Sequence, residues 1–200
     1  MIKKTMFVVV LCAALFSCSK NDSDVQQPSN GSPTTSQNDS DGQQSSHDRP
    51  ATAQSSPYPD TLLAYMPAPG QFVNTSTANN AAAESITGGT SGIVSLGAFG
   101  GYIVLGFDHT VLNGTGSDMK IIGNASAQDA EPGVAWVMHD DNGNGKADDK
   151  WYELKGSELG KTGYIRNYSV TYNKPLHDSD DVKWADNQGN TGVIKHNIYH

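Results

Sequence analysis

Between residues 140 and 148 the chain carries oxygen-bearing side chains at a spacing that suits a calcium ion. Counted from the first aspartate, they stand at positions 1, 3, 5 and 9, with a glycine at position 6 and a backbone carbonyl at position 7. The residues are Asp140, Asn142, Asn144, Asp148, Gly145 and Lys146. Calcium prefers oxygen ligands, and calcium loops use this spacing with a glycine at the sharp turn. The sequence therefore predicts a structural calcium site.

The end of this loop departs from the pattern of a helix–loop–helix calcium site. Position 12 is Trp151 instead of the bidentate glutamate, and the flanking segments are strand-like. Glu153 or Asp149 could supply the missing carboxylate. A second interpretation stays open, because Asn142-Gly143 and Asn144-Gly145 are each typical hairpin-turn dipeptides. The loop could then be a polar turn that binds no metal.

Other chemically capable residues form no recognisable catalytic set. Glu131, Glu153 and Glu158 could pair as the acid and base of a glycoside hydrolase, but sequence does not give their separation. Asp108-His109 has no serine in a Gly-x-Ser-x-Gly motif to act with. The Gly-Lys-Thr at 160–162 lacks the first glycine of a phosphate-binding loop. We expect a protein that is not an enzyme.

Three aromatic residues are candidates for ligand contacts. Trp151 and Tyr152 follow the acidic loop, and Trp184 lies in an expected loop at residues 180–190. Exposed aromatic rings bind sugars by stacking, although packing in the core is the more usual role of such residues. Trp136 stands between valines and is expected to be buried.

The N-terminus resembles an export signal. Lys3 and Lys4 precede the apolar run Met6–Phe16, which is too short to span a bilayer. The run ends in Leu15-Phe16-Ser17-Cys18, which is similar to the lipobox of bacterial lipoproteins. We expect residues 1–17 to be a signal peptide and Cys18 to carry the lipid anchor. Cys12 and Cys18 are the only cysteines, so the remaining chain has no disulfide or cysteine nucleophile.

Composition divides the rest of the chain into a stalk and one domain. Residues 18–59 are rich in Ser, Gln, Asp and Pro and are expected to be a disordered stalk. This stretch helps to explain a hydrophobic content of only 36%. Residues 60–200 then form one domain. The excess of 21 acidic over 13 basic residues, a net charge of −8, argues against nucleic-acid binding.

Residues 60–200 are expected to fold as an all-β domain, a jelly-roll-like antiparallel sandwich. β-branched and aromatic runs separated by Gly, Asn and Asp clusters predict strands at 93–96, 102–107, 119–122, 134–138, 151–154, 168–172 and 193–198. Only residues 77–85 favour a helix. The run 102–107 is apolar on both faces and predicts a central strand, whereas 168–172 alternates and predicts one wet face. The segment ending at His200 has no turn or capping signal, which suggests that the domain is truncated there.

Several motifs resemble a family of cell-surface lipoproteins of gut Bacteroidetes. They are Val94-Ser95-Leu96-Gly97, the Gly-Gly-led segment 100–109, Asn113-Gly114 with Asp118 and Gly123-Asn124, Glu131–Val134, and the acidic-aromatic segment 148–158. The acidic stretch 21–24 is similar to the signal that exports such lipoproteins to the outer face of the outer membrane. The similarity covers about residues 63–200 and brings no catalytic residues with it.

This resemblance implies a jelly-roll-like domain at the cell surface, anchored in the outer membrane and exposed to the medium. It implies a non-enzymatic ligand-binding module in nutrient capture, beside an outer-membrane importer. A glycan is one expected ligand and cobalamin is another. A glycoside-hydrolase-type enzyme and a structural adhesin are the alternatives.

Overall fold

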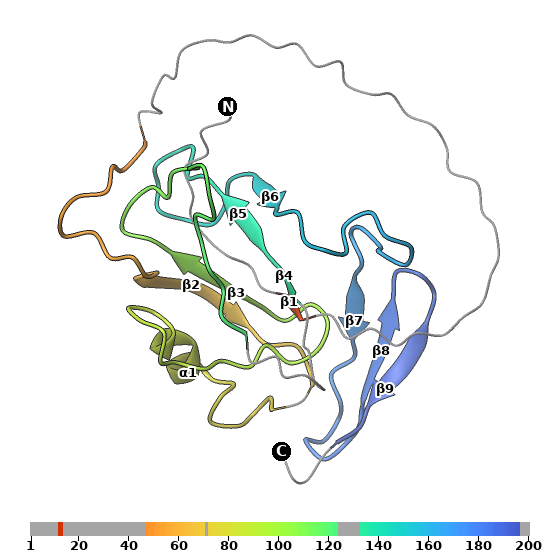
Figure 1. The fold of residues 1–200 in the computed structure, drawn as a ribbon. Coiled ribbons are helices and arrows are strands. Elements are labelled where there is room, and N and C mark those ends of the chain that lie inside the picture. The colour runs from red at the N-terminus through yellow and green to blue at the C-terminus, as the bar shows by residue number, and fades with distance from the viewer. Residues whose placement is uncertain (1–11, 14–46, 71, 124–132, 197–200) are drawn as a thin grey trace.

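The computed structural model describes residues 12–13, 47–70, 72–123 and 133–196. Within them the chain is nearly all β, and every strand pairing is antiparallel (Figure 1). The elements are β1 (Cys12–Ala13), β2 (Thr61–Met66), α1 (Asn80–Ser85), β3 (Tyr102–Gly106), β4 (Gly133–Val134), β5 (Trp136–Met138), β6 (Trp151–Glu153), β7 (Val170–Tyr172), β8 (Val182–Asp186) and β9 (Thr191–Ile194). The expected all-β antiparallel class is confirmed. The described pairings form separate sheets, β1–β4, β2–β3, β5–β6 and β7–β8–β9, and closure into a jelly roll stays a prediction.

β3 is the strand around which the core is built. Its side chains alternate between two apolar surroundings: Ile103 and Leu105 pack with Ala83 of α1, whereas Val104 packs toward Trp151 of β6. Ile103, Val104 and Leu105 are all buried, and complete burial of such a side chain contributes roughly 1.5–3 kcal/mol. Coverage of both faces of this strand is confirmed, but the prediction of a central strand is not, because β3 pairs only with β2 among the described residues. The side chains of β3 are apolar at successive positions because they pack against a different layer on each face of the strand.

The helix α1 covers one face of the β2–β3 pair. Asn79 caps it, since its side-chain oxygen accepts the Ala82 N–H at 2.9 Å. Ala82 and Ala83 form its buried face. The helix ends at Ser85, with Ile86 as its C-cap, shortly before Gly88-Gly89, where glycine flexibility disfavours further helix. The expected helical segment is therefore confirmed, over a shorter range.

β5 and β6 form a hairpin that carries the acidic loop at its tip. Trp136 pairs with Glu153 and Met138 pairs with Trp151, so residues 139–150 connect the two strands. Met138 is only 1% exposed, and Val137 packs beside its cross-strand partner Tyr152. The acidic loop therefore connects two strands whose side chains are well packed.

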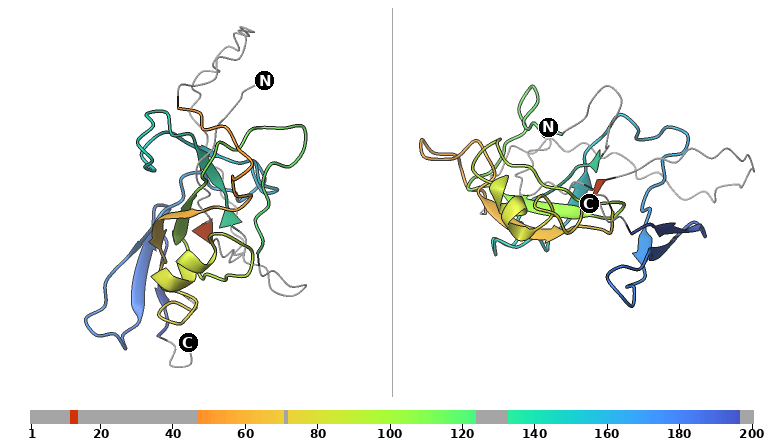
Figure 2. Two further views of the ribbon diagram at one scale, coloured as in Figure 1. Left: turned by 90° about the vertical axis from the view of Figure 1, so that its left-hand side faces the viewer. Right: turned by 90° about the horizontal axis from the view of Figure 1, so that it is seen from below.

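The β7–β8–β9 sheet stands at one side of the molecule (Figure 2). Tyr172 ties it to the body, because its hydroxyl donates to the carbonyl of Phe99 at 2.9 Å. The Phe99 ring also meets the edge of Tyr168 with centroids 5.1 Å apart. In β7, Val170 and Tyr172 are half-buried while Thr171 is exposed, which confirms the prediction of one wet face.

Two predicted strands are wrong. Residues 93–96 form no strand and make only isolated backbone bonds, from Ser95 to Thr77 and from Ala68 to Leu96. Residues 119–122 form no strand either, and Ile121 and Ile122 are exposed. β-Branched residues favour a strand only where a partner lies beside them, and neither segment has a strand partner among the described residues.

Two strands of the domain were missed by the sequence pattern. β2, which pairs with β3 along its whole length, precedes the first predicted strand. β8 occupies part of the expected loop at 180–190 and places Trp184 in the middle of a three-stranded sheet. The expectation that Trp184 lies in a loop is therefore wrong. Charged residues interrupt the apolar pattern of this strand, because one side of the β7–β9 sheet is exposed. The sequence pattern therefore did not reveal the strand.

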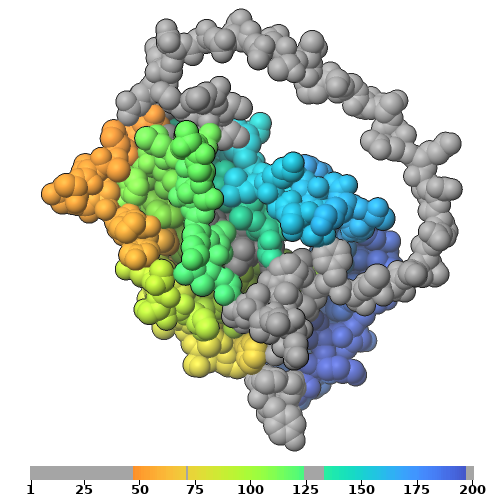
Figure 3. Space-filling model, viewed as in Figure 1, coloured from red at the N-terminus to blue at the C-terminus, as the bar shows by residue number. Residues whose placement is uncertain are grey.

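Part of the segment that was counted with the stalk contacts the domain. Residues 47–59 run along one side of the molecule, largely exposed, and contact it at several points (Figure 3). The Arg49 N–H donates to the Thr110 hydroxyl, the Thr110 N–H donates to the Arg49 carbonyl, and the Ser56 N–H donates to Asp108 at 3.0 Å. A polar composition does not prevent docking when the backbone finds partners. Cys18 and the stalk up to residue 46 lie outside the described residues, as do Glu131 and His200.

The short strand β1 falls inside the predicted signal peptide. Cys12 and Ala13 pair with Val134 and Gly133 of β4. Removal of residues 1–17 during export would take this pairing away and leave β4 without its described partner.

Candidate metal centre

The acidic loop closes on itself around the carboxylate of Asp140. Asp140 follows β5 and is 7% exposed. Its two oxygens accept the backbone N–H groups of Asn144 at 3.0 Å and Gly145 at 2.9 Å. Gly145 has a φ of +71°, in the left-handed region that favours glycine. The loop thus has the sharp turn at position 6 that the calcium spacing requires.

The next candidate ligands are linked to one another by hydrogen bonds across this turn. Asn142 and Asn144 each use the side-chain oxygen to accept a backbone N–H two residues on, at 3.0 and 2.8 Å. Their amide groups donate to the carboxylate of Asp148 at 3.0–3.3 Å. Asp148 is thereby linked to Asn144, whose backbone binds Asp140. The structure brings together four predicted side chains: Asp140, Asn142, Asn144 and Asp148.

Hydrogen bonds stabilise the ionised carboxylate of Asp148. The bonds from Asn144 and then Asn142 lower the pKa of Asp148 below its ordinary value, and desolvation opposes this effect. These amide donors stabilise the negative charge of Asp148, which a bound cation would otherwise neutralise. An ion that enters the loop must replace these hydrogen bonds with oxygen coordination.

Neither proposed source of a further carboxylate is directed at the loop interior. Asp149 accepts the backbone N–H of Asp141 at 3.0 Å and so holds the two ends of the loop together. Glu153 lies farther along β6 and accepts a hydrogen bond from the hydroxyl of Tyr164. The bond raises the pKa of Tyr164. The structure therefore places Glu153 with Tyr164 and not with Asp140.

The donor set that remains consists of two carboxylates, two amides and a carbonyl. Among the described residues, no three His, Cys, Asp or Glu side chains lie close enough to hold a metal ion. Calcium also accepts asparagine and backbone carbonyl oxygens as ligands, and these are not among the four side-chain types just named. The residues fit a hard cation with oxygen ligands, and they do not fit zinc or another metal that needs nitrogen or sulfur ligands.

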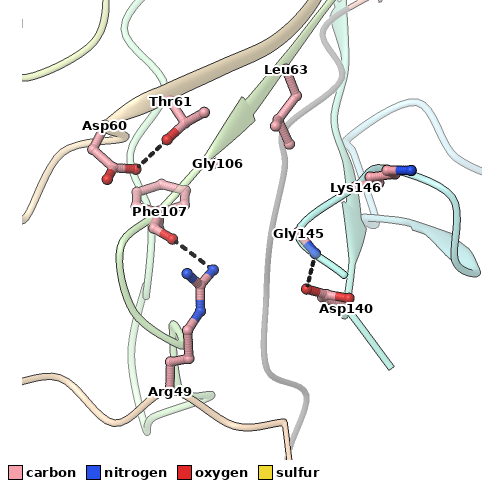
Figure 4. A pocket seen from close by; sticks show the side chains of 9 residues that line it. All are labelled: Arg49, Asp60, Thr61, Leu63, Gly106, Phe107, Asp140, Gly145 and Lys146. Carbon is pink, nitrogen blue, oxygen red and sulfur yellow. Dashed lines mark hydrogen bonds between the residues drawn. The ribbon is translucent and has the colours of Figure 1, made fainter. Parts of the chain in front are cut away.

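A small hollow of about 100 Å³ adjoins the loop (Figure 4). Its walls come from β2, the end of β3, the segment that precedes β2 and the acidic loop. The lining residues are Arg49, Asp60, Thr61, Leu63, Gly106, Phe107, Asp140, Gly145 and Lys146. Figure 4 shows the Arg49 guanidinium directed at the Phe107 carbonyl, to which it donates at 3.2 Å. A space of this size accommodates ions and water and is too small for a sugar chain.

The three aromatic candidates do not form one binding platform. Trp151 packs with Val104 on one face of the hairpin, and Tyr152 packs with Val137 on the other. Trp184 lies in a different sheet and covers Gly192 on the neighbouring strand. All three side chains are half-buried, as is Trp136. Packing accounts for much of each ring, and any ligand contact would involve the part that remains exposed.

A larger hollow of about 240 Å³ lies beside β4 and β6. Its polar residues include Glu153, Ser157, Glu158 and Tyr164, and apolar side chains such as Val134, Leu154 and Leu159 complete it. The sequence singled out both glutamates but gave no reason to place them on one wall. The structure brings them to the same hollow.

Sequence reasoning missed the residues that pack on the outside of the loop. His139 contacts Asp141 through one ring nitrogen and Asp48 through the other, the latter at 3.3 Å. His47 lies against Gly143. No signal in the sequence connects residues 47 and 48 with a loop some ninety positions away, since the contact exists only in the folded chain.

Comparison with known proteins does not identify a family for this chain. No family model matches the chain, and no curated protein matches it. In the part of the chain that the structure describes, no helix has the length and apolar character needed to cross a membrane.

Proposed function

We propose that this protein is a lipid-anchored, non-enzymatic binding module whose β5–β6 hairpin is stabilised by calcium. The observation that carries the proposal is the convergence of Asp140, Asn142, Asn144 and Asp148 around a glycine turn. The lipobox-like sequence at Cys18 supports an anchor in the outer membrane, and the acidic stretch behind it supports exposure at the cell surface. Nutrient capture beside an importer follows from the resemblance to surface lipoproteins.

Calcium is favoured over magnesium by the kind of ligand and by their arrangement. Magnesium demands near-octahedral geometry and retains several waters, whereas calcium tolerates irregular sets of carboxylate, amide and carbonyl oxygens. Lys146 would add its backbone carbonyl to the four side chains. With only two carboxylates directed inward, we expect the weak affinity of extracellular modules, a dissociation constant of about 10⁻⁴–10⁻³ M.

A bound cation would act on the hairpin that carries Trp151 and Tyr152. Four aspartates, at 140, 141, 148 and 149, lie within ten residues of one another and repel. A divalent ion removes that repulsion and fixes the loop, because it binds the folded state alone. The role of the metal is structural, and it preorganises the neighbouring surface for a ligand.

The hollow beside β4 and β6 is the better place for that ligand. It combines hydroxyl and carboxylate groups with apolar side chains, which is the mixture that orients the polar edge and the apolar face of a sugar ring. We favour the end group of a glycan here, because cobalamin is much larger than a hollow of about 240 Å³. Cobalamin could bind only across a wider surface.

A glycoside hydrolase is the second candidate, since Glu153 and Glu158 line the same hollow. Hydrolysis needs one carboxyl group that stays protonated as the general acid, which requires a raised pKa. The hydrogen bond from Lys161 instead lowers the pKa of Glu158. Glu158 is therefore unsuited to the role of general acid, which a hydrolase of this kind would assign to Glu153. Turnover of an oligosaccharide that disappears in Glu153→Gln would contradict the non-enzymatic proposal.

Thermal melts with EDTA and with added calcium test the metal site. At a tenfold excess over the dissociation constant, binding contributes about 1.4 kcal/mol, or a rise of roughly 3–6 °C in melting temperature. The shift should vanish when Asp140→Ala and Asp148→Ala are combined, and persist in Asp178→Ala, which changes an exposed aspartate outside the loop. No shift in the unaltered protein, or an equal shift in the double variant, would leave a plain hairpin turn.

A further inference from the structure

We propose that the segment of residues 47–59 positions the acidic loop for its cation through His47, Asp48 and Arg49. The segment and the ion then bind to the rest of the domain cooperatively. The inference rests on the proposed calcium site and adds positioning residues that the loop sequence does not contain. It also joins the metal to the chain that leads to the anchor, because the segment lies directly between the stalk and β2.

The first contact is the packing of His47 against the tip of the loop. A Cβ atom placed on Gly143 would lie 2.4 Å from Nδ1 of His47, closer than a side chain permits. Gly143 also has a φ of +70°, which disfavours other residues. The imidazole therefore rests on the backbone of the loop, between the positions of Asn142 and Asn144.

The second contact runs from the segment through a histidine to the loop. Nε2 of His139 lies 3.3 Å from the carboxylate of Asp48, and Nδ1 of His139 contacts the carboxylate of Asp141. The side chains of Asp48 and His139 are only 12% and 13% exposed. His139 directly precedes Asp140, so the segment constrains the residue from which the calcium spacing is counted.

The third contact fixes the segment on the rest of the domain. The Arg49 N–H donates to the hydroxyl of Thr110 at 2.8 Å, and the Thr110 N–H donates to the Arg49 carbonyl at 2.6 Å. The Arg49 guanidinium donates to the Phe107 carbonyl and lines the hollow that Asp140 and Gly145 also line (Figure 4). Thr110 is 2% exposed, so the segment is held at a buried residue of the domain.

These contacts make the cation and the segment two ligands of one loop conformation. If the docked segment restrains the loop in its closed form, less conformational entropy is lost when the cation binds. Linkage then requires the reverse effect of equal size, so that the cation must hold the segment on the domain. When calcium is low, the segment should leave more often, and the tether behind the anchor should lengthen by residues 47–59.

Hydrogen–deuterium exchange of the full processed chain, with EDTA or with saturating calcium, tests this coupling. We expect calcium to slow exchange at the loop amides of Asn144 and Gly145 and also at the amides of Arg49 and Ser56, by a factor of about 5 or more. Slower exchange at the loop without any change at Arg49 and Ser56 would overturn the coupling and leave the calcium site standing. No change at the loop itself would instead contradict the proposed calcium function.

Two variants on opposite sides of the segment test reciprocity. Asp48→Ala removes the partner of His139, and Thr110→Val removes the acceptor of the Arg49 N–H, so both should weaken calcium binding about 5-fold or more in calorimetric titration. Thr115→Val makes the same chemical change at an exposed site and should leave the affinity unchanged. Affinities in Asp48→Ala and Thr110→Val equal to that of the unaltered protein would refute the positioning role. Asp48→Ala keeps the test decisive if Thr110→Val does not fold, because Asp48 lies outside the hydrophobic core.

Discussion

The carboxylate of Asp140 and the backbone N–H of Gly145 lie 2.9 Å apart, and this bond closes the acidic loop across a glycine with a φ of +71°. The first position of the calcium spacing is thus joined directly to the sixth. Because the bond involves the backbone, the conformation of Gly145 determines where the Asp140 oxygens point. The loop conformation and any cation site depend on the same residue.

Gly145→Ala should disturb this loop more than an otherwise similar change elsewhere. No atom lies within 4 Å of a Cβ built at Gly145, so its positive φ alone opposes the substitution. Left-handed backbone costs a non-glycine residue about 1–2 kcal/mol, which should appear as a lower free energy of unfolding and a weaker calcium response. Gly156→Ala is the control, because that site is equally open and has no positive φ. Equal losses in both variants in urea melts would refute the argument.

Tyr168 should make the protein sensitive to alkaline pH. Burial and a 2.9 Å hydrogen bond to Asp186 raise its pKa from 10.0 to about 12. A raised pKa in the folded state stabilises the protonated form, so its contribution is complete below pH 10 and is lost as the pH rises toward 12. Tyr168→Phe should flatten the fall in unfolding free energy over that range. An unchanged pH profile in urea melts would contradict the assignment. Tyr65, Tyr164 and Tyr172 also have raised pKa values and contribute to the remaining slope.

Gly192→Ala should loosen the β7–β9 sheet. A Cβ at this position would lie 2.5 Å from the Trp184 ring, which covers the glycine from the neighbouring strand. Overpacking of this kind costs typically about 1–3 kcal/mol, and the Trp184 fluorescence should change with it. Gly116→Ala, at a site with open space around it, should have little effect. A full-stability Gly192→Ala protein would show that Trp184 can move aside and that its packing is loose.

Cys18→Ala tests the lipid anchor. Lipidation supplies membrane affinity through the buried acyl carbons, so the variant should leave the membrane fraction. Fractionation of cells, with detergent extraction of the unaltered protein as the reference, measures this. A Cys18→Ala protein that is processed yet stays with the membrane would contradict the lipoprotein assignment. Protease treatment of intact cells separately tests exposure at the surface, and complete protection of the stalk would place the protein on the inner side.

The sequence was sufficient where structure depends on neighbouring residues. The β-branched run around Ile103 and Val104 predicted a strand buried on both faces, because its side chains are apolar at every position. The spacing from Asp140 to Asp148 predicted a compact loop with a glycine turn, since Asx bonds and left-handed glycines act over a few residues. The alternation in β7 gave the correct wet face.

Tertiary structure decided which segments found partners and which distant residues met. Ile121 and Ile122 have strand-forming side chains and remain unpaired by any described strand, whereas the charged segment around Trp184 became the middle strand of a sheet. Glu153 was drawn to Tyr164 and away from the acidic loop, and Asp48 reached His139 from a segment counted with the stalk. Strand pairing and ion pairing join residues far apart in sequence, and their free energy depends on what the fold places beside each group.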